Sequence, residues 1–250
     1  MTNIILCGCG GRMGRAIIES VKDDCTIVAG VDVNASALST GFPVYEKISD
    51  FPGKADVIVD FSHHSALPSL IEYAKATKTP IVLATTGHTD EELALIDESV
   101  NEIAIFRSGN FSLGINLLIT LAKQAAKTLG ADFDVEIIEK HHNKKLDAPS
   151  GTALMIADAI ASEREESEYV FDRHSERKAR ESKEIGLHSV RGGTIVGEHE
   201  AIFAGENEIV TISHSAASRE IFATGALRAA VYLAKKEKGL YNMTDMIEGR

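Results

Sequence analysis

Cysteine is scarce in this chain. Only three cysteines occur among 250 residues, Cys7, Cys9 and Cys25. A disulfide framework needs an even, dispersed set, and a zinc site usually needs CxxC pairs. Cys7 and Cys9 stand two apart in what reads as the end of a buried strand. We therefore interpret them as small buried hydrophobic residues and expect no metal ion.

Basic residues are fewer than acidic ones. The sequence has 26 Lys and Arg against 37 Asp and Glu, a formal net charge of -11 at pH 7. A nucleic-acid-binding protein needs a basic face, and so, more weakly, does docking on an anionic membrane. We expect neither as a partner. A small anionic substrate stays possible, because local geometry can gather positive charge in an acidic protein.

Long hydrophobic runs are absent from the start of the chain. Residues Met1 to Leu6 show no basic segment and no long apolar run, so they predict neither a signal peptide nor a membrane span. The expected location is the cytoplasm. With 44% hydrophobic and 25% charged residues, the composition is typical of a globular protein that buries a sizeable core.

Strand-like and helix-like patterns alternate in the first half of the chain. Strands are expected at 3–7, 26–33, 56–61, 80–84 and 103–106, and helices at 13–21, 65–76 and 89–100. Either Thr89 or Asp90 is a suitable N-cap for the last of these helices. The alternation predicts βαβ units and a parallel sheet buried on both faces.

After about Asn110 the pattern changes. Helices are expected at 113–129, 149–161 and 219–236, a strand at 133–139, and several β-like runs between 185 and 214. Consecutive strands without long helices favour an antiparallel or mixed sheet. The charge-dense stretch at 164–184 is interpreted as a solvated loop. The predicted class is α/β: a doubly wound Rossmann domain at 1–112, completed by the C-terminal segment 219–250, and an α+β domain with a mixed sheet at 113–218.

A glycine-rich loop, GCGGRMG, joins the first strand to the first helix. Glycines let the backbone approach a pyrophosphate closely, and a helix start offers N–H groups to it. The spacing departs from GxGxxG, since the third glycine position falls on Met13; it fits GxxGxxG at Gly8, Gly11 and Gly14. A tight turn without a ligand is the alternative. Asp32, at the end of the next strand, is placed to bind ribose hydroxyls, and the two features together favour a dinucleotide.

Two further polar segments follow predicted parallel strands. They are Ala84-Thr85-Thr86-Gly87 and Ser108-Gly109-Asn110-Phe111. Ligands of open α/β sheets bind beyond the carboxyl ends of the strands. Both segments are therefore expected to line the nicotinamide side of a cofactor site, although neither would indicate a site alone.

The segment 139–153, EKHHNKKLDAPSGTA, carries the densest reactive chemistry of the chain. Ser150 is a suitable N-cap, and the N–H groups of Gly151 and Thr152 then form an anion site at a helix start. Lysines and histidines beside such a site can bind carboxylates and donate protons. Phosphate binding and a plain charged loop are the alternatives. A metal site is disfavoured, because no ligand set is complete.

In these motifs the sequence resembles the bacterial dihydrodipicolinate reductases of lysine and diaminopimelate synthesis. The resemblance covers essentially the whole chain. It is carried by GCGGRMGR, DFS, ATTG, SGNFSLGIN, the HHxxKxDAPSGT string and HSVRGGTIVGEHE. It implies a Rossmann domain and a substrate-binding domain whose mixed sheet builds a homotetramer.

The resemblance also implies residue roles. His141 would be the catalytic proton donor or acceptor, Lys145 a proton donor, and His142 a substrate contact, while Gly151 and Thr152 would bind a substrate carboxylate. Contacts to the cofactor would come from Gly8, Cys9, Gly10, Gly11, Arg12, Met13, Asp32, Ala84, Thr85, Thr86, Ser108, Gly109, Asn110 and Phe111. Arg219 could meet substrate or simply cap the last helix, and the sequence assigns it no role.

The implied reaction reduces a small dianionic cyclic imine, derived from 4-hydroxy-tetrahydrodipicolinate, to tetrahydrodipicolinate with NADH or NADPH. Two alternatives remain at this point. One is another small-substrate NAD(P)-dependent dehydrogenase on the same plan. The other is a non-catalytic nicotinamide-binding redox sensor, which would not need two histidines and a lysine beside an anion site.

Overall fold

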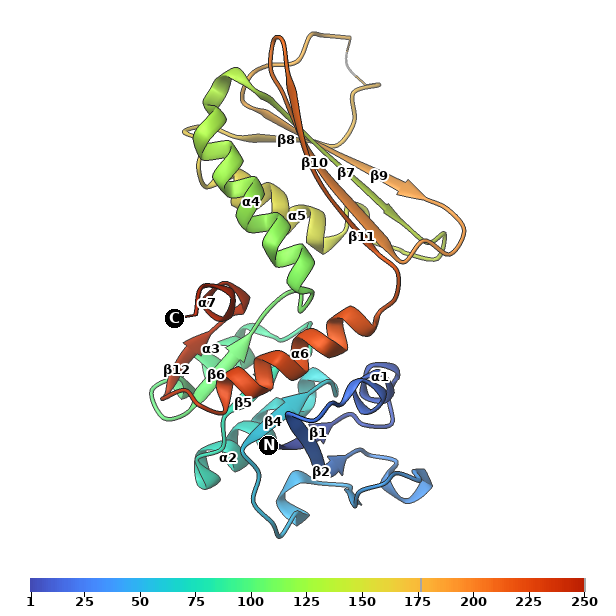
Figure 1. Ribbon diagram of the computed structural model, residues 1–250, viewed down its shortest axis with the longest axis vertical. Coiled ribbons are helices and arrows are strands. Elements are labelled where there is room, and N and C mark those ends of the chain that lie inside the picture. The colour runs from blue at the N-terminus through green and yellow to red at the C-terminus, as the bar shows by residue number, and fades with distance from the viewer. Residues whose placement is uncertain (176, 250) are drawn as a thin grey trace. The chain divides into compact units, whose positions relative to one another are not determined.

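The computed structural model describes residues 1–175 and 177–249, which divide into two compact units. The first unit is Met1–Ser112 together with the described residues from Glu220 onward, and the second is Leu113–Arg219. The chain thus leaves the first unit once and returns to it near its C-terminus. Figure 1 shows both chain ends in this unit.

The first unit is built on one parallel sheet. Its strand order is β12-β6-β5-β4-β1-β2-β3, and every pair of neighbours is parallel. The strands are β1 Thr2–Cys7, β2 Cys25–Val31, β3 Val44–Tyr45, β4 Val57–Asp60, β5 Ile81–Leu83, β6 Ala104–Arg107 and β12 Gly239–Tyr241. The helices are α1 Arg12–Ser20, α2 Leu67–Thr77, α3 Asp90–Ser99, α6 Glu220–Leu233 and α7 Met243–Glu248, with short 3-10 turns at Ala35–Ala37, Ile48–Asp50 and His64–Ala66.

Helices cover this sheet on both faces. Apolar residues of α2 and α3 form one core with alternate residues of β1, β2, β4 and β5. Helix α6 packs on β4, β5 and β6 and also contacts α1, as Figure 1 shows for the helix that crosses the strands. Double coverage explains why these strands are continuous apolar runs without alternation. The short elements β3, β12 and α7 were not predicted from the sequence.

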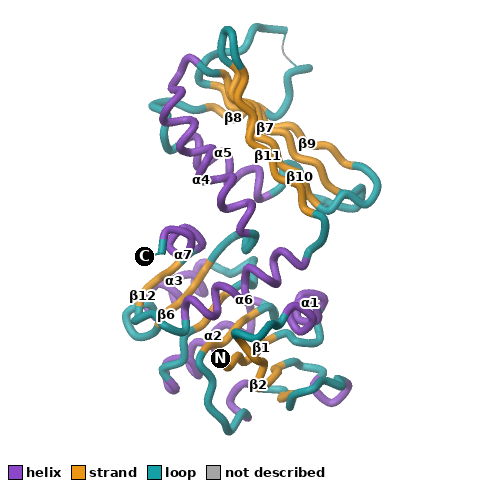
Figure 2. The backbone as a smooth tube through the Cα atoms, in the orientation of Figure 1, coloured by secondary structure: helices purple, strands orange, loops and turns teal. Residues whose placement is uncertain are grey.

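The second unit is built on a mixed sheet. Its order is β11-β10-β7-β9-β8; β7 is antiparallel to β10 and parallel to β9. The strands are β7 Asp134–His141, β8 Glu168–Val170, β9 Glu184–Arg191, β10 Gly197–Ala204 and β11 Ile209–Ala216, and the helices are α4 Leu113–Leu129 and α5 Gly151–Ala161, with a 3-10 turn at Gly130–Asp132. Apolar residues of α4 and α5 pack on one face of the sheet, and Figure 2 shows both helices on the same side of the strands.

Two local expectations were wrong. Strand β7 does not end at Glu139 but continues to His141, because Lys140 pairs with β10 and β9 and His141 pairs with β9. The charge-dense stretch at 164–184 is not only loop, since Glu168–Val170 pairs with β9 as an edge strand. Charged side chains are common on edge strands, where they discourage pairing with other chains.

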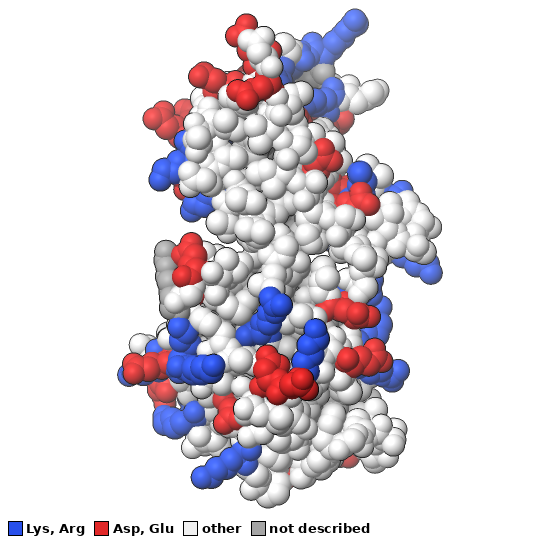
Figure 3. Space-filling view, in the orientation of Figure 1, with Lys and Arg blue, Asp and Glu red and all other residues white. Residues whose placement is uncertain are grey.

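The surface carries mixed charge. On the face shown in Figure 3, acidic and basic side chains are interspersed over both units. Helix α4 exposes two leucines one turn apart, Leu117 and Leu121. Within the described residues, no helix is both long and apolar enough to cross a bilayer.

Helix α3 shows which of two possible caps begins it. The side chain of Thr89 accepts a hydrogen bond from the Glu92 N–H at 3.3 Å, and the Glu92 carboxylate accepts one from the Thr89 N–H at 2.9 Å. This reciprocal capping box satisfies two N–H groups that the helix itself cannot. Asp90 is therefore the first helical residue and not the cap.

The capping box predicts unequal effects at two adjacent positions. Thr89→Ala should lower the free energy of unfolding by about 1 kcal/mol, because the Glu92 N–H loses its acceptor. Asp90→Ala should cost only a few tenths of a kcal/mol, the contribution of one charge near the helix dipole. Thr89→Ser should stay near wild type. Urea unfolding followed by circular dichroism measures all three, and a larger loss for Asp90→Ala than for Thr89→Ala would contradict the assignment.

Candidate active site

The first unit contains a cavity of about 1200 Å³ at the carboxyl ends of β1 and β2. Its lining includes Gly8, Gly10 and Gly11 of the glycine loop, and Asp32 directly after β2. It continues past Lys47 and Ser49 to Phe61, Ser62 and His63 beyond β4. The cavity therefore lies where open parallel sheets bind nucleotides.

The glycine loop has the shape that a pyrophosphate requires. Gly8 has φ +74°, and a Cβ there would lie 2.5 Å from the Phe61 carbonyl oxygen. A Cβ on Gly14 would lie 2.3 Å from the Gly8 carbonyl oxygen, so this glycine lets α1 approach β1. Gly11 is the N-cap of α1 and offers its first-turn N–H groups no side-chain acceptor. A phosphate fits this requirement for an anionic acceptor.

Asp32 is held in place by the loop that it faces. One carboxylate oxygen accepts a hydrogen bond from the Gly10 N–H at 2.9 Å, and the other accepts one from the Asn34 N–H at 3.0 Å. The carboxylate therefore sits on the cavity wall beside the glycine loop, where ribose hydroxyls can reach it.

The other residues expected from the glycine loop lie in different settings. Cys9 is buried, Arg12 is exposed and Met13 is partly buried, and none of the three lines the cavity. Arg15 does line it. Sequence reasoning missed Arg15, although it stands one helical turn beyond Arg12.

The carboxyl ends of β4 and β5 are joined by a buried acid that the sequence did not single out. Asp60 accepts hydrogen bonds from the Ser62 N–H, the Ser62 hydroxyl and the Thr85 hydroxyl at 3.0, 2.5 and 2.7 Å. Burial raises its pKa, and these hydrogen bonds oppose the rise. Asp60 thus fixes Thr85, with Ala84 and Thr86 on either side, at the end of β5.

The segment Ser108–Phe111 follows β6. The Ser108 hydroxyl donates to the Asn110 carbonyl at 2.8 Å, and the Asn110 side chain accepts from the Ser112 N–H at 2.8 Å. Gly109 lies between them. The Phe111 ring is buried against Phe61 and Phe106, so its side chain belongs to the core.

In the second unit, strand register gathers four reactive side chains on one face of the sheet. Glu139 and His141 are two apart on β7 and point the same way. His141 pairs with Arg191 on β9, and Glu139 pairs with His199 on β10. This is the face on which α4 and α5 pack, since Val135 and Ile137 of the same strand belong to that core.

Glu139 is the centre of this group. Its side chain has no exposed surface. Arg191 binds both carboxylate oxygens at 2.7 and 2.8 Å, His141 Nδ1 lies 2.5 Å from Oε2, and the Ser150 N–H donates to Oε1 at 3.1 Å. Burial alone would raise the pKa of Glu139, but hydrogen bonds from Arg191, His141 and Ser189 outweigh it and lower the pKa to about 2. Glu139 is therefore an anion.

The loop between β7 and α5 carries the expected lysine. Lys145 Nζ lies 2.9 Å from an Asp147 carboxylate oxygen, and this contact lowers the pKa of Asp147. Arg191 reaches the same loop and donates to the Asp147 carbonyl at 2.7 Å. One guanidinium thus ties the loop to Glu139.

Helix α5 begins as the sequence predicts. The Ser150 hydroxyl accepts from the Ala153 N–H at 3.2 Å and marks the N-cap. Gly151 and Thr152 occupy the first turn, where N–H groups can bind an anion. Ser150 itself is buried, and its N–H is held by Glu139.

His142 faces a cation that sequence reasoning left without a role. Its Nε2 lies 3.5 Å from Arg219 Nη2. Its Nδ1 is buried and has no hydrogen-bond partner among the described residues. Lys145 stands in the same turn, since its N–H donates to the His142 carbonyl at 3.2 Å, so three basic residues meet at the loop that leads into α5. The position of Arg219 just before a helix was the only signal in the sequence.

His199 lies beneath this group as a buried neutral histidine. Its Nε2 is 3.1 Å from the Ser150 hydroxyl, and its ring packs edge-on against His141 with centroids 5.2 Å apart. Burial, then the neighbouring His141, lowers the pKa of His199 to about 4. Among the residues that the structure describes, no three His, Cys, Asp or Glu side chains gather as metal ligands.

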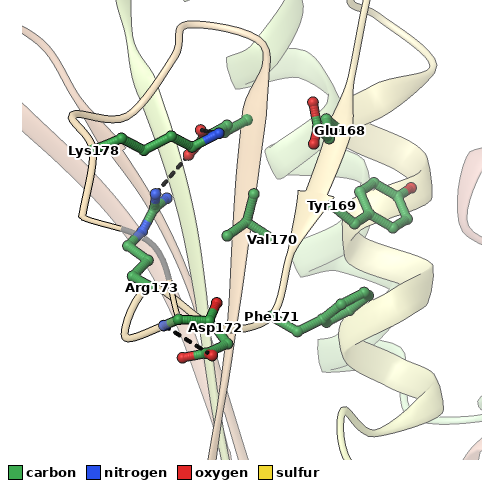
Figure 4. Close-up of a pocket in the computed structure, with 9 residues that line it drawn as sticks. Glu168, Tyr169, Val170, Phe171, Asp172, Arg173 and Lys178 are labelled. Atoms are coloured by element: carbon green, nitrogen blue, oxygen red, sulfur yellow. Dashed lines mark hydrogen bonds and ion pairs between the residues drawn. The ribbon is translucent and has the colours of Figure 1, made fainter.

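A second cavity, of about 220 Å³, lies beside β8. Figure 4 shows Arg173 turned toward an acidic partner and Asp172 bonded to its own loop. Arg173 lies 2.5 Å from Glu184, and Asp172 accepts from the His174 N–H at 2.8 Å. Arg173 and Asp172 are therefore already bonded to neighbouring groups. The described residues that line this cavity do not form a pair suited to catalysis.

Similar proteins are found over the whole chain. The family models described as "Dihydrodipicolinate reductase, N-terminus" and "Dihydrodipicolinate reductase, C-terminus" match residues 2–111 and 114–247. The 4-hydroxy-tetrahydrodipicolinate reductase of Caldanaerobacter subterraneus subsp. tengcongensis is 53% identical, covering 99% of both chains. That of Clostridium tetani is 50% identical, covering 99% of this chain and 97% of the relative. The solved structure of dipicolinate-bound dihydrodipicolinate reductase from Paenisporosarcina sp. TG-14 has a TM-score of 0.80 at 28% identity, with 97% of each chain covered.

The buried neutral state of His199 predicts a loss of stability in mild acid. Between the ordinary histidine pKa of 6.5 and the folded value of about 4, the unfolded chain binds a proton that the folded chain does not. Stability therefore falls as the pH falls through this window, by on the order of 3 kcal/mol from this residue. His199→Gln should remove that part of the pH dependence.

Urea unfolding at about pH 7.5 and pH 4.5 measures the effect. His174→Gln is the matched control, because His174 is exposed and its replacement should keep the wild-type pH dependence. Equal pH dependence in wild type and His199→Gln would show that His199 is not the group responsible.

Proposed function

The chain belongs to the dihydrodipicolinate reductase family, and we propose on that premise that it reduces 4-hydroxy-tetrahydrodipicolinate to tetrahydrodipicolinate with NADH or NADPH. One observation in the structure carries the proposal. The start of α5, His141, His142, Lys145 and Arg219 bring an anion site and proton-exchanging groups together in the second unit. Neither a nicotinamide-binding sensor nor a nucleotide-binding protein needs such a group.

Residues of the first unit suit the cofactor. The N–H groups at the start of α1 would hold the pyrophosphate, and Asp32 would accept hydrogen bonds from the adenosine ribose. Thr85 and the Ser108–Phe111 segment end two neighbouring strands and would face the nicotinamide side. When bound, NADH or NADPH supplies the hydride of the reaction.

The second unit suits a ring with two carboxylates. The N–H groups of Gly151 and Thr152 would bind one carboxylate at the start of α5. Arg219 and Lys145 would attract the other negative charge, and His142, which lies beside Arg219, would contact the substrate. The solved relative that holds dipicolinate, itself a flat ring with two carboxylates, supports this class of ligand.

The reaction loses water from the hydroxylated ring and then gains a hydride at C4 and a proton at C3. The proton must come from a group that holds one when the hydride arrives. His141 and Lys145 are the two candidates in the second unit. We assign His141 as the proton donor or acceptor and Lys145 as a proton donor that also binds the dianion.

The same proposal includes a homotetramer in the cytoplasm. The face of the second sheet opposite α4 and α5 exposes apolar side chains, Val190 and Ile209 among them, and the outer edge of β11 pairs with no strand of the described chain. Subunit contacts would cover such a face. NADH and NADPH are regenerated in the cytoplasm, where an enzyme that consumes them has its supply.

Turnover of the hydroxylated cyclic substrate tests the function directly. Oxidation of NADH and of NADPH is followed by absorbance with and without that substrate. Substrate-dependent oxidation supports the proposal. Tight cofactor binding without turnover would favour the redox sensor, and turnover with an amino acid or a semialdehyde instead would favour another dehydrogenase.

Lys145 should be essential for rate. Lys145→Ala should lower kcat by about a hundredfold to ten-thousandfold, the usual cost of losing a positioned proton donor. NADH affinity should change little, because the cofactor residues belong to the first unit. Lys144→Ala is the matched control and should be nearly silent, since Lys144 is exposed. Equal kcat values in the two variants would reduce Lys145 to a binding residue at most.

Asp32 should set the choice of cofactor. Its carboxylate binds ribose hydroxyls in NADH and repels the 2′-phosphate of NADPH. Asp32→Ala should therefore shift the ratio of kcat/KM values toward NADPH. Arg12 or Arg15 can offset part of the repulsion, so we expect a preference and not exclusion. An unchanged ratio in Asp32→Ala would remove Asp32 from the cofactor site.

The oligomeric state can be measured independently of activity. Light scattering of the purified protein at micromolar concentration should give four times the chain mass of 26.9 kDa. Ile209→Glu, on the outward face of β11, should shift the distribution to smaller species. A wild-type monomer would exclude the tetramer.

A further inference from the structure

We propose that Glu139 is a positioning residue for His141: its carboxylate binds the Nδ1–H of the ring and leaves Nε2 as the atom that exchanges a proton with substrate. The inference deepens the proposed function and rests on it for the role of His141. Glu139 itself would not touch substrate, because its side chain has no exposed surface. It acts through the ring.

The first step is the charge of Glu139. Its two oxygens receive Arg191 from β9 and the Ser150 N–H at the start of α5, in addition to His141. Arg191 and the backbone N–H can only donate, so the carboxyl group meets them as an acceptor without a proton. An ionised carboxylate also cannot donate to His141, and the 2.5 Å contact therefore requires the hydrogen to be on Nδ1.

The second step is the other end of the ring. With Nδ1 committed to Glu139, only Nε2 can gain or lose a proton. A Cβ on Gly197 of β10 would lie 3.1 Å from this atom, so a larger residue there would cover it. The absence of a side chain at Gly197 leaves the space next to Nε2 open, and the His141 side chain keeps 12% of its surface exposed.

The third step predicts what an amide would do in place of the carboxylate. In Glu139→Gln the amide oxygen should take the Oε1 position, where the Ser150 N–H and Arg191 both donate. The amide nitrogen then faces His141 and one Arg191 nitrogen. In the opposite orientation the amide nitrogen would face two donors, the Ser150 N–H and Arg191 Nη2. In the favoured orientation the amide N–H donates to Nδ1 of His141, so the ring hydrogen must be on Nε2.

A matched control lies on the same strand. Glu136 of β7 also binds a histidine and arginine: His188 Nε2 lies 2.6 Å from one oxygen, and Arg173 Nη2 and Arg180 Nε lie 2.6 and 3.4 Å from the other. It stands three residues before Glu139 and so points to the opposite face of the sheet. Glu136→Gln removes a comparable carboxylate without touching the candidate site.

Steady-state kinetics of the full-length protein give the first test. Glu139→Gln should lower kcat by about a hundredfold or more while KM changes little, because the ring hydrogen is then on Nε2 and the substrate-binding groups remain. Glu139→Asp, which keeps the charge, should recover a substantial part of kcat. Glu136→Gln should keep wild-type kcat, and NADH affinity should be equal in all variants. A kcat for Glu139→Gln equal to that of Glu136→Gln would overturn the proposal.

Neutron diffraction from deuterated crystals gives a second test that does not depend on turnover. In wild type the deuteron should be on Nδ1 of His141, and in Glu139→Gln the Nδ1 atom should be bare and Nε2 deuterated. A wild-type ring deuterated on Nε2 alone would overturn the proposal even if Glu139→Gln fails to fold. If the wild type does not reduce the substrate, the proposed function fails, while the deuteron position still decides whether Glu139 orients His141.

Discussion

The ion pair between Glu139 and Arg191 connects β7, β9 and the start of α5 at the candidate site of the second unit. The carboxylate joins the end of β7 to the start of α5, and the guanidinium joins β9 to the loop between them. A buried charge is costly unless geometry and further hydrogen bonds compensate it, and the Glu139 side chain has no exposed surface. Here both carboxylate oxygens accept hydrogen bonds, so the cost of burial is offset by an arrangement that also fixes both ends of the loop between β7 and α5.

Much of this architecture could be predicted from the sequence, because the patterns that specify it are local. Apolar runs placed the buried strands β1, β4 and β5, and Ser150 placed the start of α5. Elements without a local signal were missed: β12 has three residues and becomes a strand only through its pairing with β6. The chain's family, fold class and cofactor class were predicted correctly from the motifs.

The sequence singles out several residues of the candidate site, but it does not show how they are connected. The spacing of Glu139 and His141 shows that they share a face once the strand is known to reach His141. Arg191 lies far along the chain, and only the register of β9 against β7 reveals that it meets Glu139. Likewise, only the structure shows that Arg15 of α1 lines the cavity and that Asp60 joins the ends of β4 and β5.

The return of the chain to its first unit has a consequence for synthesis. Helix α6 and strand β12 complete the parallel sheet and its cover, yet they are synthesised only after the whole second unit. The sheet begun by the first residues must therefore wait, with the β6 edge and one apolar face open, while the whole mixed-sheet unit is made and can fold. During that interval chaperones have a defined surface to protect, and a chain that stops before α6 would lack β12 and one helix of the cover of the parallel sheet.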